Sequence, residues 1–289
     1  MVKLISAFAP AKLNLYLRVV GRRADGYHEL DSIFVPISIG DRIAIETRPS
    51  DRTVVNLCGS FGNLPAGEHN LAVRAATAFM REFAVTAEVL IDLRKSIPPG
   101  AGLGGGSSDA ATVLRMMATL FRIDIDQSER LARVAVSIGA DVPFFLNPIP
   151  ARVTGIGERI APLYAFPQFA LVVAVPPIEV PTAAIFRDLQ PQDWSGPASD
   201  ADVLAIAAGE SSPRLFVNDL ARTAMAQWPE IARLKARLEE RGARAASMTG
   251  SGAGVFGIFA STDEANRAAA ELCERDPAVI AIATTIYRG

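Results

Sequence analysis

A glycine-rich segment near the middle of the chain runs Pro98-Pro99-Gly100-Ala101-Gly102-Leu103-Gly104-Gly105-Gly106-Ser107-Ser108. Glycine occupies five of the seven positions from 100 to 106. Because glycine has no Cβ atom, its backbone N–H can approach an anion closely, and a following helix adds partial positive charge at its N-terminus. The segment lies between a predicted strand and a predicted helix beginning at Ser107 or Ser108. It therefore predicts a phosphate-binding loop.

Other interpretations compete for this segment. It lacks the Gly-Lys-Ser/Thr ending of a P-loop, which disfavours that class of NTPase. Gly100, Gly102 and Gly105 satisfy the dinucleotide pattern G-x-G-x-x-G, and Asp124 and Asp126 follow about 20 residues on, where a ribose-binding acid is expected. The proline pair at 98 and 99 does not fit a buried strand that runs straight into a dinucleotide turn. A dinucleotide-dependent oxidoreductase thus stays an alternative, as does a flexible connector.

Length and composition indicate two domains. The chain has 289 residues, half of them hydrophobic, which exceeds a usual single domain. We place the domains at residues 1–150 and 151–289, and leave open that the last strand returns to the first domain. The formal net charge is -2, without a basic stripe, so nucleic acid is not an expected partner.

Signals for metals, disulfides and membranes are weak. Cys58 and Cys273 show neither a disulfide framework nor zinc spacing, and His28 and His69 form no metal-ligand pattern. The first apolar stretch is too short for a signal peptide. No apolar run approaches the roughly 20 residues that cross a bilayer. We expect a cytoplasmic protein with no protein-bound metal and no membrane partner.

Hydrophobic patterning predicts an α+β protein. Lys12 and Asn14 alternate with apolar residues and should share one face of a strand. Further strands are expected over 42–47, 53–57 and 88–93, and a helix over 71–83 with Asn70 as its N-cap. The second half fits the β-α-β-β-α-β order of a ferredoxin-like fold with extra helices. Its strands are expected at 169–175, 245–248, 255–259 and 279–286, with a helix over 263–273.

Three segments together resemble the GHMP kinases, the superfamily of galactokinase and the homoserine, mevalonate and phosphomevalonate kinases. They are Pro10–Leu15 (PAKLNL), the glycine-rich segment, and Thr249–Gly254 (TGSGAG). Asp25–Leu30 (DGYHEL) and Gly139–Phe145 (GADVPFF) resemble those members that act on a cytidylated methylerythritol. The resemblance implies ATP-dependent phosphorylation of the 2-hydroxyl of this small molecule. It also implies a ribosomal S5 domain 2-like N-terminal domain and a ferredoxin-like C-terminal domain.

Two residues are candidates for catalysis. Phosphoryl transfer needs positioning, charge stabilisation and a group that accepts the hydroxyl proton. With the resemblance, Asp141 is the candidate base; without it, an N-cap or turn position before Pro143 would be favoured. Lys12 is the candidate to stabilise the Asp141 carboxylate and the transition-state charge, and it is one of only four lysines. By alternation alone, Lys12 would be a solvated strand residue.

The resemblance also implies binding roles. Tyr27 and Phe186 would sandwich the cytosine ring, His28 would hydrogen-bond its edge and Thr182 would add a contact. A core position explains either aromatic equally well, and Phe186 in particular, because it lies on a predicted helix. Asn14 would orient the substrate. ATP would bind the segment 98–108, with Asn70 and Lys95 flanking the adenine and Mg²⁺ arriving with the nucleotide. Ser107 and Ser108 remain open as helix caps or as ligands, and Asp109 is expected to be structural.

Other functions remain as alternatives. A GHMP kinase for homoserine or mevalonate would share the same segments, and a non-catalytic nucleotide-binding regulator could use the same fold. The presence of both Lys12 and Asp141 argues against the regulator. The sequence is compatible with a monomer or a homodimer.

Overall fold

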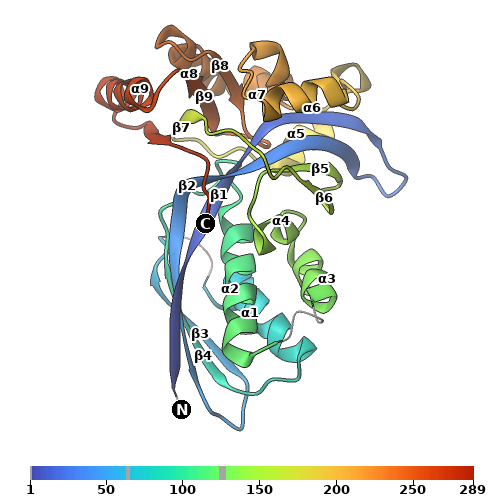
Figure 1. Ribbon diagram of the computed structural model, residues 1–289, viewed down its shortest axis with the longest axis vertical. Helices are drawn as coiled ribbons and strands as arrows, with labels where there is room; N and C mark the ends of the chain where they lie inside the picture. The colour runs from blue at the N-terminus through green and yellow to red at the C-terminus, as the bar shows by residue number, and fades with distance from the viewer. Residues whose placement is uncertain (1, 63–65, 124–127) are drawn as a thin grey trace. The chain divides into compact units, whose positions relative to one another are not determined.

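A computed structural model describes residues 2–62, 66–123 and 128–289 of the chain (Figure 1). The described residues form two compact units. The first contains residues 1–11, 39–97 and 104–148, and the second contains 12–38, 98–103 and 149–289. The second unit therefore takes two segments from the first half of the sequence. The predicted boundary between residues 150 and 151 stays a prediction.

The first unit combines a sheet with a group of helices. Strand β3 (Val54–Ser60) pairs in parallel with β4 (Glu88–Arg94), which pairs antiparallel with β2 (His28–Arg48). Helix α1 (Leu71–Glu82) packs on β3 and β4 and lies beside α2 (Gly105–Phe121), as Figure 1 shows. The short helix α3 (Ser128–Ile138) packs on both, and α4 (Val142–Leu146) packs on α2 and α3. Alternate residues of β4, namely Val89, Ile91 and Leu93, are buried.

Local sequence signals explain most of these elements. The strands predicted over 42–47, 53–57 and 88–93 are confirmed, and Asn70 caps α1 by accepting a hydrogen bond from Ala72 N at 2.9 Å. The predicted start of α2 at Ser107 or Ser108 is wrong. The helix begins at Gly105, after Gly104 with φ of 70°. Glycine has a low helix propensity, so the pattern concealed this first turn. The candidates Asp124 and Asp126 lie outside the described residues.

Strand β1 (Lys3–Arg22) pairs with β2, and each of these long strands contributes residues to both units. The alternation in β1 predicted one buried and one solvated face. That expectation is wrong, because every residue from Ala9 to Leu17 is buried. The polar side chains between Ala9 and Leu17 therefore need partners within the protein. In the second unit, β2 pairs antiparallel with β5 (Ala151–Gly155), which pairs antiparallel with β6 (Arg159–Pro162).

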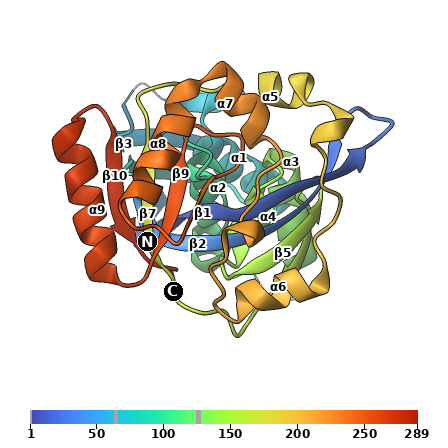
Figure 2. The same cartoon turned by 90° about the horizontal axis from the view of Figure 1, so that it is seen from above.

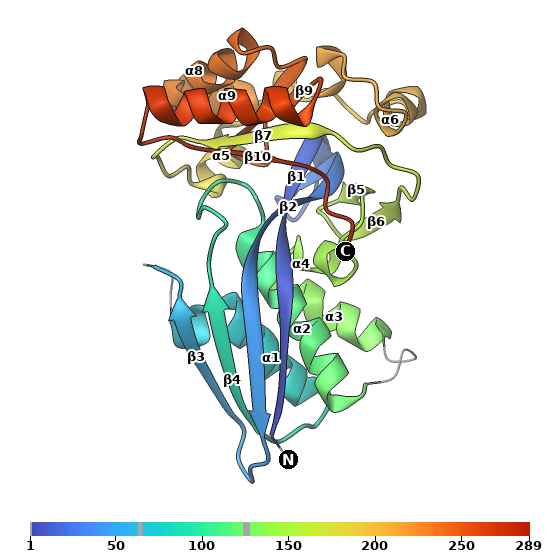
Figure 3. The ribbon, with the colours of Figure 1, turned by 60° about the vertical axis from the view of Figure 1, so that its left-hand side comes forward.

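The second unit also contains a four-stranded antiparallel sheet. Its order is β10 (Ile280–Thr284), β7 (Ala170–Val175), β9 (Val255–Phe259) and β8 (Ala245–Met248). Figures 2 and 3 show α9 (Thr262–Arg275) along β7 and β10, and α8 (Pro229–Glu240) packs on β8 and β9. This arrangement confirms the predicted ferredoxin-like fold. Beyond β10, Thr285 O accepts a hydrogen bond from Ser38 N, and Tyr287 N donates one to Pro36 O.

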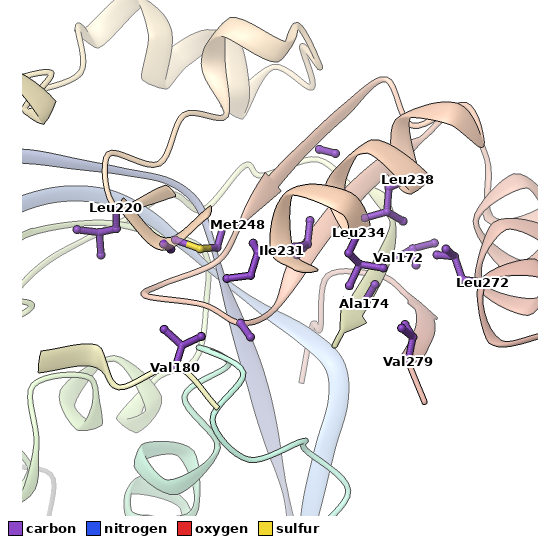
Figure 4. Packing of buried hydrophobic residues seen from close by; sticks show 14 of the residues in the cluster. Val172, Ala174, Val180, Leu220, Ile231, Leu234, Leu238, Met248, Leu272 and Val279 are labelled. Carbon is purple, nitrogen blue, oxygen red and sulfur yellow. The ribbon is translucent and has the colours of Figure 1, made fainter. Parts of the chain in front are cut away.

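A large hydrophobic cluster supports this sheet. Figure 4 shows Leu234 and Leu238 of α8 near Val172 and Ala174 of β7, with Leu272 of α9 in the same cluster. The additional helices of the second unit are α5 (Thr182–Asp188), α6 (Asp200–Ala207) and α7 (Ala221–Gln227). Across the described ranges, none of the helices combines the length and apolar character that spanning a membrane requires.

Candidate active site

The glycine-rich segment is divided between the two units. Its residues 98–103 belong to the second unit, where they pack against the glycine-rich turn Thr249–Gly254. Ala253 N donates to Gly100 O and Gly254 N donates to Ala101 O, each at 3.2 Å. A Cβ atom at Gly102, where φ is 70°, would lie 2.4 Å from Thr249 O. Part of the glycine content therefore serves the close approach of two backbone segments.

We predict that Gly102→Ala destabilises the protein more than Gly100→Ala. Both residues have a left-handed backbone, with φ of 70° at Gly102 and 67° at Gly100. Strain should therefore lower the free energy of unfolding of both variants by about 1–2 kcal/mol. A Cβ at Gly100 meets no described atom within 4 Å, whereas that at Gly102 meets backbone, which should add about 1–3 kcal/mol. Urea unfolding of the two variants measures the difference. Equal losses would contradict the packing argument.

Residues 104–108 form the start of helix α2 in the first unit. Ser108 N donates to Gly104 O at 2.9 Å, so the N–H groups of the preceding residues lie at the helix N-terminus, a favourable place for an anion. The buried Ser108 hydroxyl donates to Pro10 O at 2.6 Å. Ser108 therefore fixes α2 to β1, and Ser107 is the better candidate for a ligand.

Lys95 lies between two carboxylates of the first unit. Its Nζ donates to Asp109 Oδ2 at 2.6 Å and to Asp41 Oδ2. Asp41 Oδ1 also accepts hydrogen bonds from Ser96 N at 2.5 Å and Ile97 N at 2.9 Å. Burial, opposed by the Lys95 charge, raises the pKa of Asp109 from 3.8 to about 7. No sequence pattern singled out Asp41, and the adenine role of Lys95 and Asn70 stays a prediction.

The pH dependence of stability should reveal Asp109. A carboxyl group whose pKa is raised on folding contributes stability that is present below its ordinary pKa of 3.8 and is lost as pH rises towards 7. We expect the free energy of unfolding of Asp109→Asn to decrease less between pH 4 and pH 7 than that of the parent protein. Urea unfolding at several pH values in this window tests this. Parallel pH profiles would show that Asp109 does not titrate there.

Lys12 and Asn14 lie together in the second unit, which confirms that they share a strand face. Lys12 is only 3% exposed, and its Nζ donates to Asn14 Oδ1 at 2.5 Å. The ammonium also lies 4.9 Å from the centre of the Phe34 ring, within the range of a cation–π contact. Asn14 N donates to Thr249 Oγ1 at 2.9 Å. The turn Thr249–Gly254 is thereby bonded directly to the strand that carries Lys12.

Asp141 immediately precedes helix α4 in the first unit. Its backbone occupies the N-cap position, and Val142 N donates to Gly139 O at 3.1 Å. The Asp141 side chain caps none of the helix N–H groups in the part of the chain that the structure describes. A side-chain capping role is therefore not supported, whereas the turn position before Pro143 is observed, and the catalytic role of Asp141 stays a prediction.

The predicted cytosine-binding residues lie in the second unit. The His28 ring stacks on Phe186 at 5.4 Å between centroids, and its edge meets Trp194 at 6.0 Å. Burial and the charge of Arg22 lower the pKa of His28, which favours the neutral imidazole. Tyr27 is 63% exposed. Trp194 was not among the predicted residues; it lies in the segment 191–202, whose Pro, Ser, Gly and Asp content is typical of a loop.

Thr182 and Phe186 of the predicted cytosine-binding residues also contact other parts of the second unit. The Thr182 and Ser251 hydroxyls hydrogen-bond at 2.7 Å, so Thr182 at the start of α5 contacts the turn Thr249–Gly254. Phe186 packs against the hydrophobic cluster while also facing His28, so it contributes to the core and to this aromatic group together. The binding roles of both residues stay predictions.

Comparisons with known proteins cover nearly the whole chain. Residues 70–147 match the family described as "GHMP kinases N terminal domain", and residues 198–278 match "GHMP kinases C terminal". A 4-diphosphocytidyl-2-C-methyl-D-erythritol kinase from Thermus thermophilus is 41% identical over 266 residues, covering 91% of each chain. The homologue from Geobacter metallireducens, of the same name, is 41% identical over 93% of this chain and 94% of its own length.

Solved structures agree with these relatives. A crystal structure of 4-(cytidine 5'-diphospho)-2C-methyl-D-erythritol kinase superposes with a TM-score of 0.84 at 38% identity, covering 99% of this chain and 100% of that one. A homoserine kinase from Cytophaga hutchinsonii reaches a TM-score of 0.73 at 17% identity, covering 98% of this chain and 94% of its own. At that identity the likeness concerns the fold alone.

Proposed function

The chain belongs to the GHMP kinases, and from that premise we propose that it transfers the γ-phosphate of ATP to the 2-hydroxyl of 4-diphosphocytidyl-2-C-methyl-D-erythritol. The observation that carries the proposal is the 41% identity to a kinase of that name over 91% of both chains. This activity belongs to the synthesis of isoprenoid precursors. Cytoplasmic location and a monomeric or homodimeric state stay predictions.

In this proposal the described residues have distinct roles. Asp141 accepts the proton of the attacking hydroxyl, and the Lys12 ammonium stabilises the charge that develops on the transferred group. The first turn of α2 supplies N–H groups to the phosphates of ATP, because helix N-termini favour anions. The Ser107 hydroxyl would be the candidate protein ligand for Mg²⁺ accompanying ATP, which would help to neutralise the phosphate charge. His28, Phe186 and Tyr27 select the cytosine.

A coupled assay of ADP release tests the proposal. We expect turnover with the cytidylated methylerythritol and none with mevalonate or homoserine at the same concentration. CMP and CDP should compete with the substrate, because only the proposed substrate requires a pyrimidine site. Turnover of mevalonate or homoserine alone would overturn the substrate assignment. Tight NAD(P) binding without ATP binding would overturn the kinase assignment itself.

A further inference from the structure

A chain of buried polar groups extends from Lys12 into the second unit. Lys12 Nζ donates to Asn14 Oδ1 at 2.5 Å, and Asn14 Nδ2 donates to Ser32 Oγ at 2.9 Å. The Ser32 hydroxyl in turn donates to the backbone oxygen of Tyr16. Asn14 is 2% and Ser32 is 1% exposed. Three consecutive hydrogen bonds thus connect the Lys12 ammonium on β1, through the Ser32 side chain on β2, to the Tyr16 carbonyl on β1.

The direction of every bond in this chain is fixed by its two ends. An ammonium can only donate, and a backbone carbonyl can only accept. The Asn14 amide must therefore turn its oxygen to Lys12 and its nitrogen to Ser32. Ser32 must accept with a lone pair and use its proton on Tyr16 O. Bonds aligned in this way polarise one another, which strengthens each of them in a buried environment.

We propose that Ser32 is a positioning residue that sets the orientation of the Asn14 amide and, through it, the place of the Lys12 ammonium. The consequence for catalysis rests on the proposed function, whereas the consequence for Lys12 itself does not. Without the Ser32 hydroxyl, the Asn14 N–H and the Tyr16 carbonyl lose partners in a buried place. An unsatisfied buried group is costly, so the amide is released to rotate away from Lys12.

The test compares Ser32→Ala with Ser247→Ala, which removes the hydroxyl of another buried serine, on β8. Ser32→Thr keeps the hydroxyl and serves as the rescue variant. Because the chain has four lysines, at positions 3, 12, 95 and 235, the ¹⁵Nζ NMR spectrum of lysine-labelled protein is simple, and Lys12→Met identifies the Lys12 signal. Should Ser32→Ala fail to fold, Ser32→Cys retains the volume with a weaker hydrogen bond.

We expect Ser32→Ala to shift the Lys12 signal but not those of the other lysines, and Ser247→Ala to shift none of them. With the proposed substrate, kcat should fall about 10- to 100-fold while KM for ATP stays constant, as for a misplaced catalytic group. Ser32→Thr should restore both. An unchanged Lys12 signal in folded Ser32→Ala overturns the inference. If Ser32→Ala shifts the Lys12 signal but the parent protein phosphorylates none of the tested alcohols, the inference about Ser32 is supported and the proposed function is overturned.

Discussion

Replacing Asp141 with asparagine is expected to lower kcat by about 100- to 10,000-fold, the range associated with loss of a general base. Asparagine has nearly the same shape but cannot accept the hydroxyl proton at neutral pH. ATP binding should be retained, because the substitution leaves the glycine-rich segment intact. Steady-state ADP release gives kcat, and calorimetric titration with ATP gives the affinity.

Asp263→Asn provides a matched control for this substitution. Asp263 is an exposed residue in the first turn of α9 and forms no part of the proposed site. Its activity should equal that of the parent protein. If Asp141→Asn turned over at the parent rate, Asp141 would not be the base. Loss of ATP affinity in parallel with kcat would indicate a binding role for Asp141.

Asp31→Asn is expected to cause the largest loss of stability among single charge substitutions. Asp31 is 1% exposed and accepts hydrogen bonds from Tyr16 Oη at 2.9 Å, Ala198 N at 2.8 Å and two Arg152 nitrogens at 2.8 and 3.0 Å. We expect the free energy of unfolding to fall by about 3 kcal/mol, the low end for a broken buried pair, because Arg152 is partly exposed. Urea unfolding at pH 7 measures this loss.

Asp200→Asn tests the same arginine from its exposed side. Arg152 Nη1 donates to Asp200 Oδ1 at 3.0 Å, but the Asp200 side chain is 90% exposed. Asp200→Asn should therefore lower the free energy of unfolding by less than about 1 kcal/mol. Similar losses in the two variants would contradict the assigned importance of burial.

The stability loss on acidification should also distinguish Asp31→Asn from the parent protein. Burial alone would raise the pKa of Asp31, but hydrogen bonds from Arg152, Ala198 and Tyr16 outweigh it and hold the pKa below 3.8. A carboxylate with a lowered pKa contributes stability that is present above its ordinary pKa and disappears as pH falls through the folded value. Asp31→Asn should therefore lose less stability than the parent on acidification below pH 4.

Local patterns were sufficient for much of the fold. The strands β8 and β9 were predicted to the residue, because each is a short apolar run bounded by turn residues. Asn70 was identified as an N-cap from its residue type and position alone. The shared face of Lys12 and Asn14 follows from the period of two in a strand.

Contacts between distant segments could not be predicted in this way. Asp41 reaches Lys95 across 54 residues, and Asn14 reaches Thr249 across 235. Periodicity states which face a side chain occupies but not which remote segment covers that face. For the same reason the solvated face expected for Lys12 proved to be buried, and Trp194 became visible only as a neighbour of His28.

The cluster around Lys95 has a consequence for the entropy of nucleotide binding. Asp41 holds the backbone at Ile97, and the same Lys95 ammonium holds Asp109, so both ends of the glycine-rich segment are tethered to one charged group. A loop that is ordered before its ligand arrives gives up less conformational freedom on binding. In the proposed function, the free protein would therefore present a preorganised loop to ATP, and more of the interaction energy with the phosphates would appear as affinity.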